Sequence, residues 1–164
     1  MSEPISQFVG NDLYLDAMIF HMLLRGQNPI SESLFQRIES GDIQAHTSVL
    51  TFDELAYRML LALIKDRYKG SPLENLRQNQ TTLIGELYPQ LEPPFTKLYH
   101  FPNLSIHEIA AVDLIAMQGN IREYHLLPRD ALHLATMQKC RCFQLASHDS
   151  DFDTVPFIQR YTLD

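Results

Sequence analysis

Four acidic residues are spaced along the chain so that one kind of fold would bring their carboxylates together: Asp16, Glu54, Asp130 and Asp149. Asp16 ends one short apolar segment, and Asp149 lies just beyond another. Glu54 and Asp130 lie in the first turns of expected helices. In a parallel sheet whose strands are connected by helices, these positions all fall at the carboxyl edge, where sites in such folds lie. We therefore expect one acidic site.

A cluster of carboxylates favours the binding of a hard divalent cation. Like charges held close together repel one another and raise their own pKa values, and a cation removes that cost. Mg²⁺ prefers oxygen ligands, keeps several of its waters and often binds only one or two carboxylates directly. The remaining acids would orient those waters. Because such an ion activates water and stabilises charge on a phosphodiester, the expected chemistry is metal-assisted phosphodiester hydrolysis.

Each of the four acids also has a simpler structural explanation when it is considered alone. Thr51 and Glu54 fit a capping box, with Thr51 as the N-cap of a helix that opens there. Asp130 would complement a helix dipole, and Asp149 would cap the turn at 151–153. Asp16 is the hardest to explain away, because an acid that ends an apolar strand requires a cleft at that point. The case for a site rests on the convergence of all four.

The order of apolar and turn segments predicts strands that alternate with helices. Strands are expected at 11–16, 43–47, 98–101, 143–146 and 157–161. Helices are expected at 17–24, at 31–39, from Thr51 to a break at 69–72, and at 73–87, 105–118 and 129–139. The prolines at 89, 93 and 94 predict a stiff connection. This alternation predicts a three-layer α/β/α fold with a mainly parallel central sheet.

The composition is that of an ordinary globular protein, and we expect a single domain over residues 1–164. The chain has 164 residues, 45% of them hydrophobic, which is enough to bury a core. No apolar run approaches the roughly 18–20 residues of a membrane span, and the N-terminus lacks the features of a signal peptide. Cys140 and Cys142 are too few for a disulfide framework. We therefore expect a cytoplasmic protein with no membrane contact.

The formal net charge of −7 is unusual for a protein that binds nucleic acid, because neutralising phosphates favours a basic surface. Clustered carboxylates that hold a cation would account for the acidic excess, and so would a solvated acidic surface. The basic residues that could meet phosphates are few: Lys65, Arg67, Lys69 and Arg129. Arg129 is the better candidate, because it adjoins Asp130.

Two further metal-site patterns are incomplete. The acids at 149, 151 and 153 begin like a calcium loop, but Thr154 and Arg160 stand where that loop needs Gly and Glu. His107 and Glu108 begin like a zinc-protease helix, but Ala111 stands where the second histidine belongs. Neither pattern predicts a site.

Two groups near the last third of the chain have structural explanations. Cys140 and Cys142 lie at an expected helix end, and a zinc knuckle needs more ligands than this pair provides. His133 lies three residues after Asp130 and could lean toward the acids. A histidine that packs the helix against its neighbours is the simpler interpretation.

The segments that carry the acids resemble those of the PIN domain, and within it the VapC-type toxins of bacterial and archaeal toxin–antitoxin pairs. The matching segments are Tyr14-Leu15-Asp16, Ser48–Thr51 running into Glu54-Leu55, Pro128–Ala135, and Ser147–Phe152. The resemblance runs from about residue 11 to residue 158. It is most specific in the Asp-Ala-x-His-x-Ala helix and in the Ser-x-Asp-x-Asp-Phe turn.

This resemblance implies a fold, an activity and partners. The family has a three-layer PIN-like α/β/α fold, and its members make a Mg²⁺- or Mn²⁺-dependent cut in single-stranded RNA. Homodimers are frequent, and a small antitoxin covers the acidic site. By motif position the catalytic and metal-binding acids are Asp16, Glu54, Asp130 and Asp149. Ser147 takes the place of the small hydroxyl residue near the last acid, and Asp151 is expected among the groups that orient the metal's waters.

The sequence departs from the family pattern after the first acid. The family usually has Ser or Thr and often Asn there, whereas Ala17 and Met18 follow Asp16. A hydroxyl that would orient the site is missing, which bears on the level of activity more than on the fold. Two alternatives to a ribonuclease therefore remain open: a catalytically weak PIN-like module that binds proteins, and a structure-specific DNA nuclease.

Overall fold

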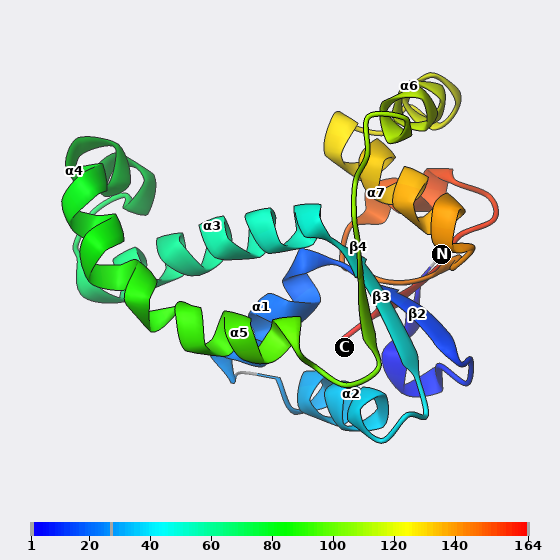
Figure 1. The fold of residues 1–164 in the computed structure, drawn as a ribbon, viewed down its shortest axis with the longest axis horizontal. Coiled ribbons are helices and arrows are strands. Elements are labelled where there is room, and N and C mark those ends of the chain that lie inside the picture. The colour runs from blue at the N-terminus through cyan, green and yellow to red at the C-terminus, as the bar shows by residue number, and fades with distance from the viewer. Residues whose placement is uncertain (1, 27, 164) are drawn as a thin grey trace.

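A six-stranded parallel sheet organises the computed structural model, which describes residues 2–26 and 28–163 (Figure 1). The strand order is β1-β6-β5-β2-β3-β4, and every neighbouring pair is parallel. The strands are β1 (Glu3–Pro4), β2 (Asp12–Leu15), β3 (Gln44–Ser48), β4 (Leu104–His107), β5 (Gln144–Ala146) and β6 (Gln159–Thr162). The central strands β2, β3 and β5 lie where the sequence predicts them.

In the described part of the chain, seven α-helices connect the strands: α1 (Ala17–Arg25), α2 (Pro29–Glu39), α3 (Val49–Arg67), α4 (Pro72–Leu87), α5 (Glu92–Tyr99), α6 (Asp113–Tyr124) and α7 (Pro128–Cys140). Short 3-10 turns cover Ile5–Gln7, Tyr88–Gln90 and Ser150–Thr154. In Figure 1 α3, α4 and α5 reach away from the sheet, whereas α6 and α7 lie together over its other side. None of the described helices combines the length and the apolar character needed to cross a membrane.

The side chains of β2 explain why helices cover both faces of the sheet. Leu13 and Leu15 are fully buried in the larger core, together with Phe20 from α1 and Leu34 from α2. Tyr14 points to the opposite face and packs with residues of α7 and β5 in a second core. Successive side chains of a strand alternate between faces, so a strand buried on both sides requires helices on both sides. The predicted three-layer α/β/α fold is confirmed.

The segment between residues 88 and 124 differs from the prediction. A strand at 98–101 and a helix at 105–118 were wrong, because α5 occupies 92–99, β4 occupies 104–107 and α6 starts only at 113. The prolines at 93 and 94 do not form a stiff connection. They lie in the first turn of α5, where the missing N–H of proline leaves no helical hydrogen bond unmade.

The start of α3 also differs from the prediction. The helix begins at Val49 with Ser48 as its N-cap residue, so Thr51 lies inside the helix and the capping-box interpretation is wrong. The hydroxyl of Thr51 lies 2.8 Å from that of Thr47, which donates to the carbonyl of Leu15 on the neighbouring strand. Glu54 is consequently in the second turn of α3 rather than the first. The Glu54 carboxylate therefore does not cap α3 and is free to take part in the acidic site.

The sheet extends beyond the range over which the sequence motifs match. β1 precedes residue 11 and pairs with β6, which ends after residue 158. The sequence analysis did not predict β1, because two residues carry no periodic pattern. Residues 1 and 164, the limits of the expected domain, lie outside the described residues.

Candidate active site at the carboxyl edge of the sheet

The structure brings the predicted acids to the same edge of the sheet. Asp16 follows β2 directly, Asp149 follows β5 after two residues, and Asp130 lies in the first turn of α7. Carboxylate oxygens of Asp130, Asp149 and Asp151 lie within 4.8 Å of one another. Asp16 and Glu54 form an adjoining group, which lies within the same distance of a ring nitrogen of His133.

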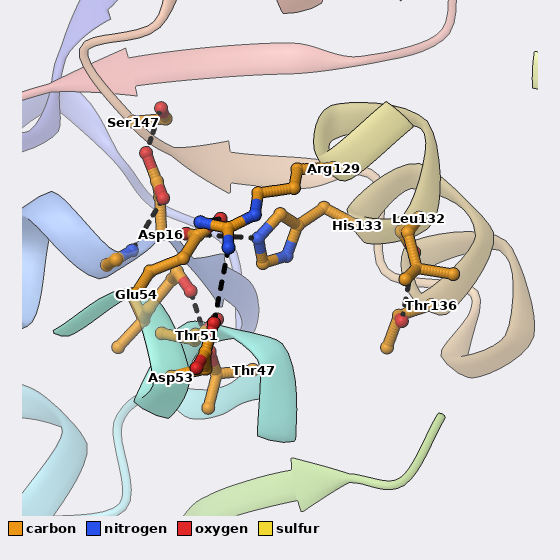
Figure 2. A network of polar contacts seen from close by, with 12 residues as sticks. Asp16, Thr47, Thr51, Asp53, Glu54, Arg129, Leu132, His133, Thr136 and Ser147 are labelled. Atoms are coloured by element: carbon orange, nitrogen blue, oxygen red, sulfur yellow. Dashed lines mark hydrogen bonds and ion pairs between the residues drawn. The ribbon is translucent and has the colours of Figure 1, made fainter. Parts of the chain in front are cut away.

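Asp16 is held in place by two hydrogen bonds. The hydroxyl of Ser147 donates to Asp16 Oδ2 at 2.6 Å, and the backbone N–H of Ala17 donates to Oδ1 at 2.5 Å (Figure 2). Ser147 is fully buried and also accepts from the backbone N–H of Asp149 at 3.0 Å. One hydroxyl therefore links the loops that carry two of the acids. Ser147 therefore supplies Asp16 with a side-chain hydroxyl donor, whereas Ala17 donates only from its backbone N–H.

Asp149 has the structural role that its sequence position predicts. Its Oδ1 accepts from the backbone N–H of Asp151 at 2.9 Å and caps the 3-10 turn at 150–154. Asp16 plays the same kind of role for α1, which the sequence analysis did not anticipate. Both carboxylates are thus positioned by the fold itself before any cation is considered.

Asp130 has the most perturbed carboxyl group of the cluster. Its pKa is raised from 3.8 to about 6, chiefly by burial and then by the nearby carboxylates of Asp149, Asp151 and Asp16, against a lowering effect of His133. Asp16 and Asp149 both lie close enough to Asp130 to disfavour its ionised form, so the acids share one electrostatic environment. Crowding of this kind is relieved by a cation.

A buried hydrogen-bonded chain runs from Tyr14 through His133 to Glu54. The Tyr14 hydroxyl lies 3.0 Å from His133 Nδ1. His133 Nε2 lies 3.4 Å from Glu54 Oε2 (Figure 2). Burial raises the pKa of Tyr14 far above its usual value, so the phenol keeps its proton and can donate it to Nδ1. With Nδ1 as the acceptor, Nε2 carries a ring proton and faces Glu54.

Glu54 is the acid whose charge the site stabilises. Burial alone would raise its pKa, but the hydrogen bond from His133 and the charges of His133, Arg129 and Arg58 outweigh that effect, and the pKa falls below its usual value. Glu54 therefore carries a negative charge at neutral pH, whereas the pKa of neighbouring Asp130 is raised to about 6. The two acids are held in different electrostatic states.

His133 shows where the sequence analysis fell short. It is buried and packs edge-on against Tyr14, as a helix-packing histidine would. It also contacts Glu54, so it belongs to the acidic site as well. The signal was its spacing of three residues from Asp130, which puts both side chains on one face of α7.

Asp16, Glu54 and Asp130 open into a cleft of about 630 Å³. It is lined by residues of α3 and of the segment before and at the start of α7, together with Asp16: Glu54, Tyr57, Arg58, Leu61, Leu127, Pro128, Arg129 and Asp130. Arg129, the predicted RNA contact, is 60% exposed and lies 3.5 Å from Glu54 and 3.3 Å from Asp53. Arg58 and Tyr57 were not predicted. They add a cation and an aromatic ring to the cleft.

The donor set of the cluster suits Mg²⁺ or Mn²⁺. Its ligand atoms are carboxylate oxygens, with one imidazole nitrogen already committed to Glu54. Hard cations prefer oxygen donors, and a bound cation would offset both the burial of Asp130 and the repulsion from the carboxylates beside it, which raise its pKa. The chemistry of the site therefore fits the cation that the sequence motifs imply.

Comparison with known proteins gives matches at the level of structure alone. No family model matches the chain, and no curated protein sequence matches it. A toxin–antitoxin complex from Klebsiella pneumoniae matches with 19% identity and a TM-score of 0.51 over 89% of this chain and 94% of that one. VapBC2 from Rickettsia felis, bound to a promoter DNA fragment, matches with 13% identity and a TM-score of 0.58 over 93% and 99%.

A third match is FitAB bound to an IR36 DNA fragment, with 14% identity and a TM-score of 0.56 over 92% of this chain and 94% of that one. All three alignments span nearly the whole length of both chains. At identities this low they show the fold alone. The chain therefore has the PIN-type α/β/α fold of these toxin–antitoxin structures, as the motifs of its sequence indicated.

Proposed function

We propose that this protein is a metal-dependent endoribonuclease that cleaves single-stranded RNA and acts as the toxin of a toxin–antitoxin pair in the cytoplasm. The observation that carries the proposal is the convergence of the acids: carboxylate oxygens of Asp130, Asp149 and Asp151 lie within 4.8 Å of one another, and Asp130 lines one cleft with Asp16 and Glu54. Such convergence at the carboxyl edge of a parallel sheet, inside an open cleft, is the arrangement of a site rather than of four independent helix caps.

We assign Asp16, Asp130 and Asp149 as the direct ligands of the cation. Glu54 and Asp151 would lie beside it without binding it directly. When bound, Mg²⁺ or Mn²⁺ supplies Lewis acidity toward a phosphodiester oxygen and toward the attacking water. Ser147 holds Asp16 in its orientation through the 2.6 Å hydrogen bond, and His133 holds Glu54.

The cleft offers groups that suit an RNA strand despite the acidic surface. Arg58 and Arg129 line it next to the acids and place positive charge where phosphates would pass. Tyr57 is 47% exposed in the same cleft and provides a ring on which an unpaired base can stack. A single strand can contact the arginines through its phosphates and Tyr57 through an unstacked base. A rigid duplex, whose bases are stacked, can contact only the arginines.

The partners are proposed from the comparisons and from the surface beside the cleft. One of the three similar structures is a toxin–antitoxin complex, and the other two are VapBC2 and FitAB, each bound to a DNA fragment. An apolar groove of about 330 Å³ between α3 and α4 shares Tyr57 with the acidic cleft and is lined by Leu60, Ile84 and Tyr88. A small antitoxin lying in this groove would reach the acids. Homodimer formation is the second expected association, and light scattering of the purified protein measures it.

Cleavage of a labelled single-stranded RNA tests the proposal. We expect products with Mg²⁺ or Mn²⁺ and none with EDTA. Asp130→Asn should lower the rate by more than about 100-fold, because losing a metal ligand exceeds the 10–100-fold effect of an outer partner. Asp42→Asn, which changes an exposed acid in the loop before β3, is the matched control and should cleave normally.

Three outcomes would redirect the proposal. Cleavage that persists in EDTA or in Asp130→Asn would remove the acids from the reaction. Cleavage of single-stranded or branched DNA in place of RNA would identify the DNA nuclease alternative. Absence of cleavage on any substrate, in a protein that still binds an antitoxin, would identify a binding module. Ala17 and the net charge of −7 favour that alternative.

A further inference from the structure

A second group of metal-ligating side chains lies outside the acidic cleft. His46 is in β3, His107 ends β4, and Cys140 is the last residue of α7. One ring nitrogen of each histidine and the sulfur of Cys140 lie within 4.8 Å of one another. His46 Nδ1 and His107 Nε2 are 3.0 Å apart, and their rings stack. None of the three residues lines the cleft.

The fold explains why these residues meet. His46 is the register partner of Tyr14 in β2, whose side chain packs on α7, so both point to the same face of the sheet. His107 lies two residues beyond Ser105, the partner of His46 in β4, and shares that face. The last turn of α7 crosses this face before the chain enters β5. Three elements far apart in sequence therefore contribute one ligand each.

The ligand types and spacings match those of a zinc site. Zn²⁺ binds imidazole nitrogen and cysteine sulfur tetrahedrally, and its usual bond lengths place two nitrogens about 3.3 Å apart and nitrogen and sulfur about 3.6 Å apart. The separation of 3.0 Å between the two nitrogens needs only a small opening to reach that value. Soft thiolate ligands also exclude Mg²⁺ and Mn²⁺, which prefer oxygen.

Asp12 provides an independent indication. Its Oδ1 lies 3.1 Å from His46 Nε2, the ring nitrogen that points away from the other two ligands. A carboxylate on that nitrogen fixes its proton there and leaves the lone pair of Nδ1 facing His107 and Cys140. This is the partner that metal-binding histidines commonly have, and it raises the basicity of the ligating nitrogen.

We propose that His46 Nδ1, His107 Nε2 and Cys140 Sγ bind one Zn²⁺ ion, with the fourth position open to water. The ion would join β3 and the edge strand β4 to the last turn of α7. The first turn of the same helix carries Asp130, so the ion would stabilise the element that positions the acidic site. The proposal does not depend on ribonuclease activity, because its ligands and its cation are different.

Cobalt provides the most specific probe of this site. Co²⁺ takes the place of Zn²⁺ in tetrahedral sites, and a thiolate ligand gives it a charge-transfer absorption that carboxylate ligands do not. We expect one equivalent of Co²⁺ to produce this band in the reduced wild-type protein, one equivalent of Zn²⁺ to abolish it, and excess Mg²⁺ to leave it unchanged.

Matched variants separate Cys140 from its neighbour. Cys140→Ala should abolish the band, whereas Cys142→Ala, which changes a buried cysteine two residues away, should retain it. His107→Gln keeps the thiol and should weaken Co²⁺ binding or change the tetrahedral spectrum. Asp12→Asn should weaken binding about 10–100-fold, the usual effect of losing an outer partner. Asp149→Asn should have no effect, which distinguishes this site from the acidic one.

Two results would overturn the proposal. One is the absence of a charge-transfer band in wild-type protein that melts cooperatively. The other is a band that persists in Cys140→Ala. In either case His46 and His107 would be a hydrogen-bonded pair beside a thiol, with no cation. A melting curve recorded for each variant without metal shows whether the variant is folded, so that loss of the band reports on the ligand.

Discussion

Single residues at the carboxyl edge of the sheet serve the fold and the candidate site at once. Asp16 caps α1 and also accepts a hydrogen bond from Ser147, while Asp149 caps a 3-10 turn beside Asp130. A capping role therefore does not argue against a functional role. The capping bonds hold the carboxylates in place, which lowers the entropy that a cation must overcome when it binds them.

Asp130→Asn tests the electrostatics of the cluster without RNA. The folded state raises the pKa of Asp130 from 3.8 to about 6, so the fold favours the protonated carboxyl. The stability that this group contributes is fully present below about pH 4 and is lost as the pH rises through about 6. Asparagine cannot ionise and does not suffer this loss.

Urea unfolding in EDTA at several pH values measures the effect. Relative to wild type, Asp130→Asn should gain stability as the pH rises from about 4 to about 7, and the difference should then level off. Asp42→Asn, at an exposed position, should show no such trend. A stability difference that is independent of pH would mean that Asp130 is not crowded by the other acids.

Tyr14→Phe tests the chain of hydrogen bonds to Glu54. The substitution keeps the ring that packs against His133 but removes the donor to its Nδ1, 3.0 Å away. Losing one buried hydrogen bond should lower the free energy of unfolding by about 1 kcal/mol. Tyr88→Phe, on the surface, should change it by less than about 0.5 kcal/mol.

Nuclear magnetic resonance of the His133 ring nitrogens gives a second measurement. In the wild type we expect Nε2 to carry a proton and Nδ1 to accept the hydrogen bond from Tyr14. In Tyr14→Phe the two tautomers should mix, because nothing then donates to Nδ1. An unchanged tautomer would show that Glu54 alone orients the imidazole.

At the scale of secondary structure, how well an element could be predicted depended on where it lies in the sheet. β2 and β5 are interior strands, and their apolar residues stand out in the sequence. β4 is an edge strand that pairs only with β3, and all four of its residues are half-buried. Its sequence, Leu-Ser-Ile-His, offers only two apolar residues. The apolar and helix-forming residues that follow it made 105–118 look like one helix.

The candidate site was predictable to the extent that it depends on strand ends. Asp16 and Asp149 follow interior strands, and Asp130 follows a proline that starts a helix, so sequence alone places them at one edge. Tyr57 and Arg58 could not be found in this way. They line the cleft only because α3 starts at Val49 and runs past the start of α7, and this packing depends on contacts between distant elements.

Two glycine substitutions test the assignment of helix ends. Gly26 follows α1 with φ of +60°, the left-handed conformation that favours glycine. Gly85 lies inside α4 with open space around its Cα. Gly26→Ala should lower the free energy of unfolding by about 1 kcal/mol, whereas Gly85→Ala should raise it by about 0.5–1 kcal/mol.

Chemical denaturation of both variants measures this contrast. Neither new methyl group meets an atom within 4 Å, so the difference in sign reports backbone conformation alone. Equal effects would indicate that α1 continues through residue 26 or that α4 is interrupted at residue 85.

At the scale of the whole molecule, the fold separates two groups of side chains that could each hold a cation. Oxygen donors gather beyond the carboxyl ends of β2 and β5, and nitrogen and sulfur donors gather where β3, β4 and the end of α7 meet. Helix α7 connects the two places. The net charge of −7 includes the acids of the first group, so part of the acidic excess is accounted for by a site that needs positive charge.

The central claim is that Asp16, Asp130 and Asp149 together hold one divalent ion. Thermal unfolding with EDTA, Mg²⁺ or Mn²⁺ tests it most directly, because an ion that binds only the folded state stabilises it by about 2.7 kcal/mol at a hundredfold excess over its Kd. The unfolded chain holds these acids far apart and cannot reproduce the site. Mg²⁺ should act at millimolar concentration and Mn²⁺ at lower concentration.

The measurement compares the wild type with Asp16→Ala, Asp149→Ala, Asp42→Ala and Cys140→Ala. We predict that Mn²⁺ raises the Tm of the wild type, of Asp42→Ala and of Cys140→Ala, and that both substitutions in the acidic cluster abolish the increase. An equal increase in all five proteins would show that the ion binds elsewhere, and it would contradict the acidic site described for this fold.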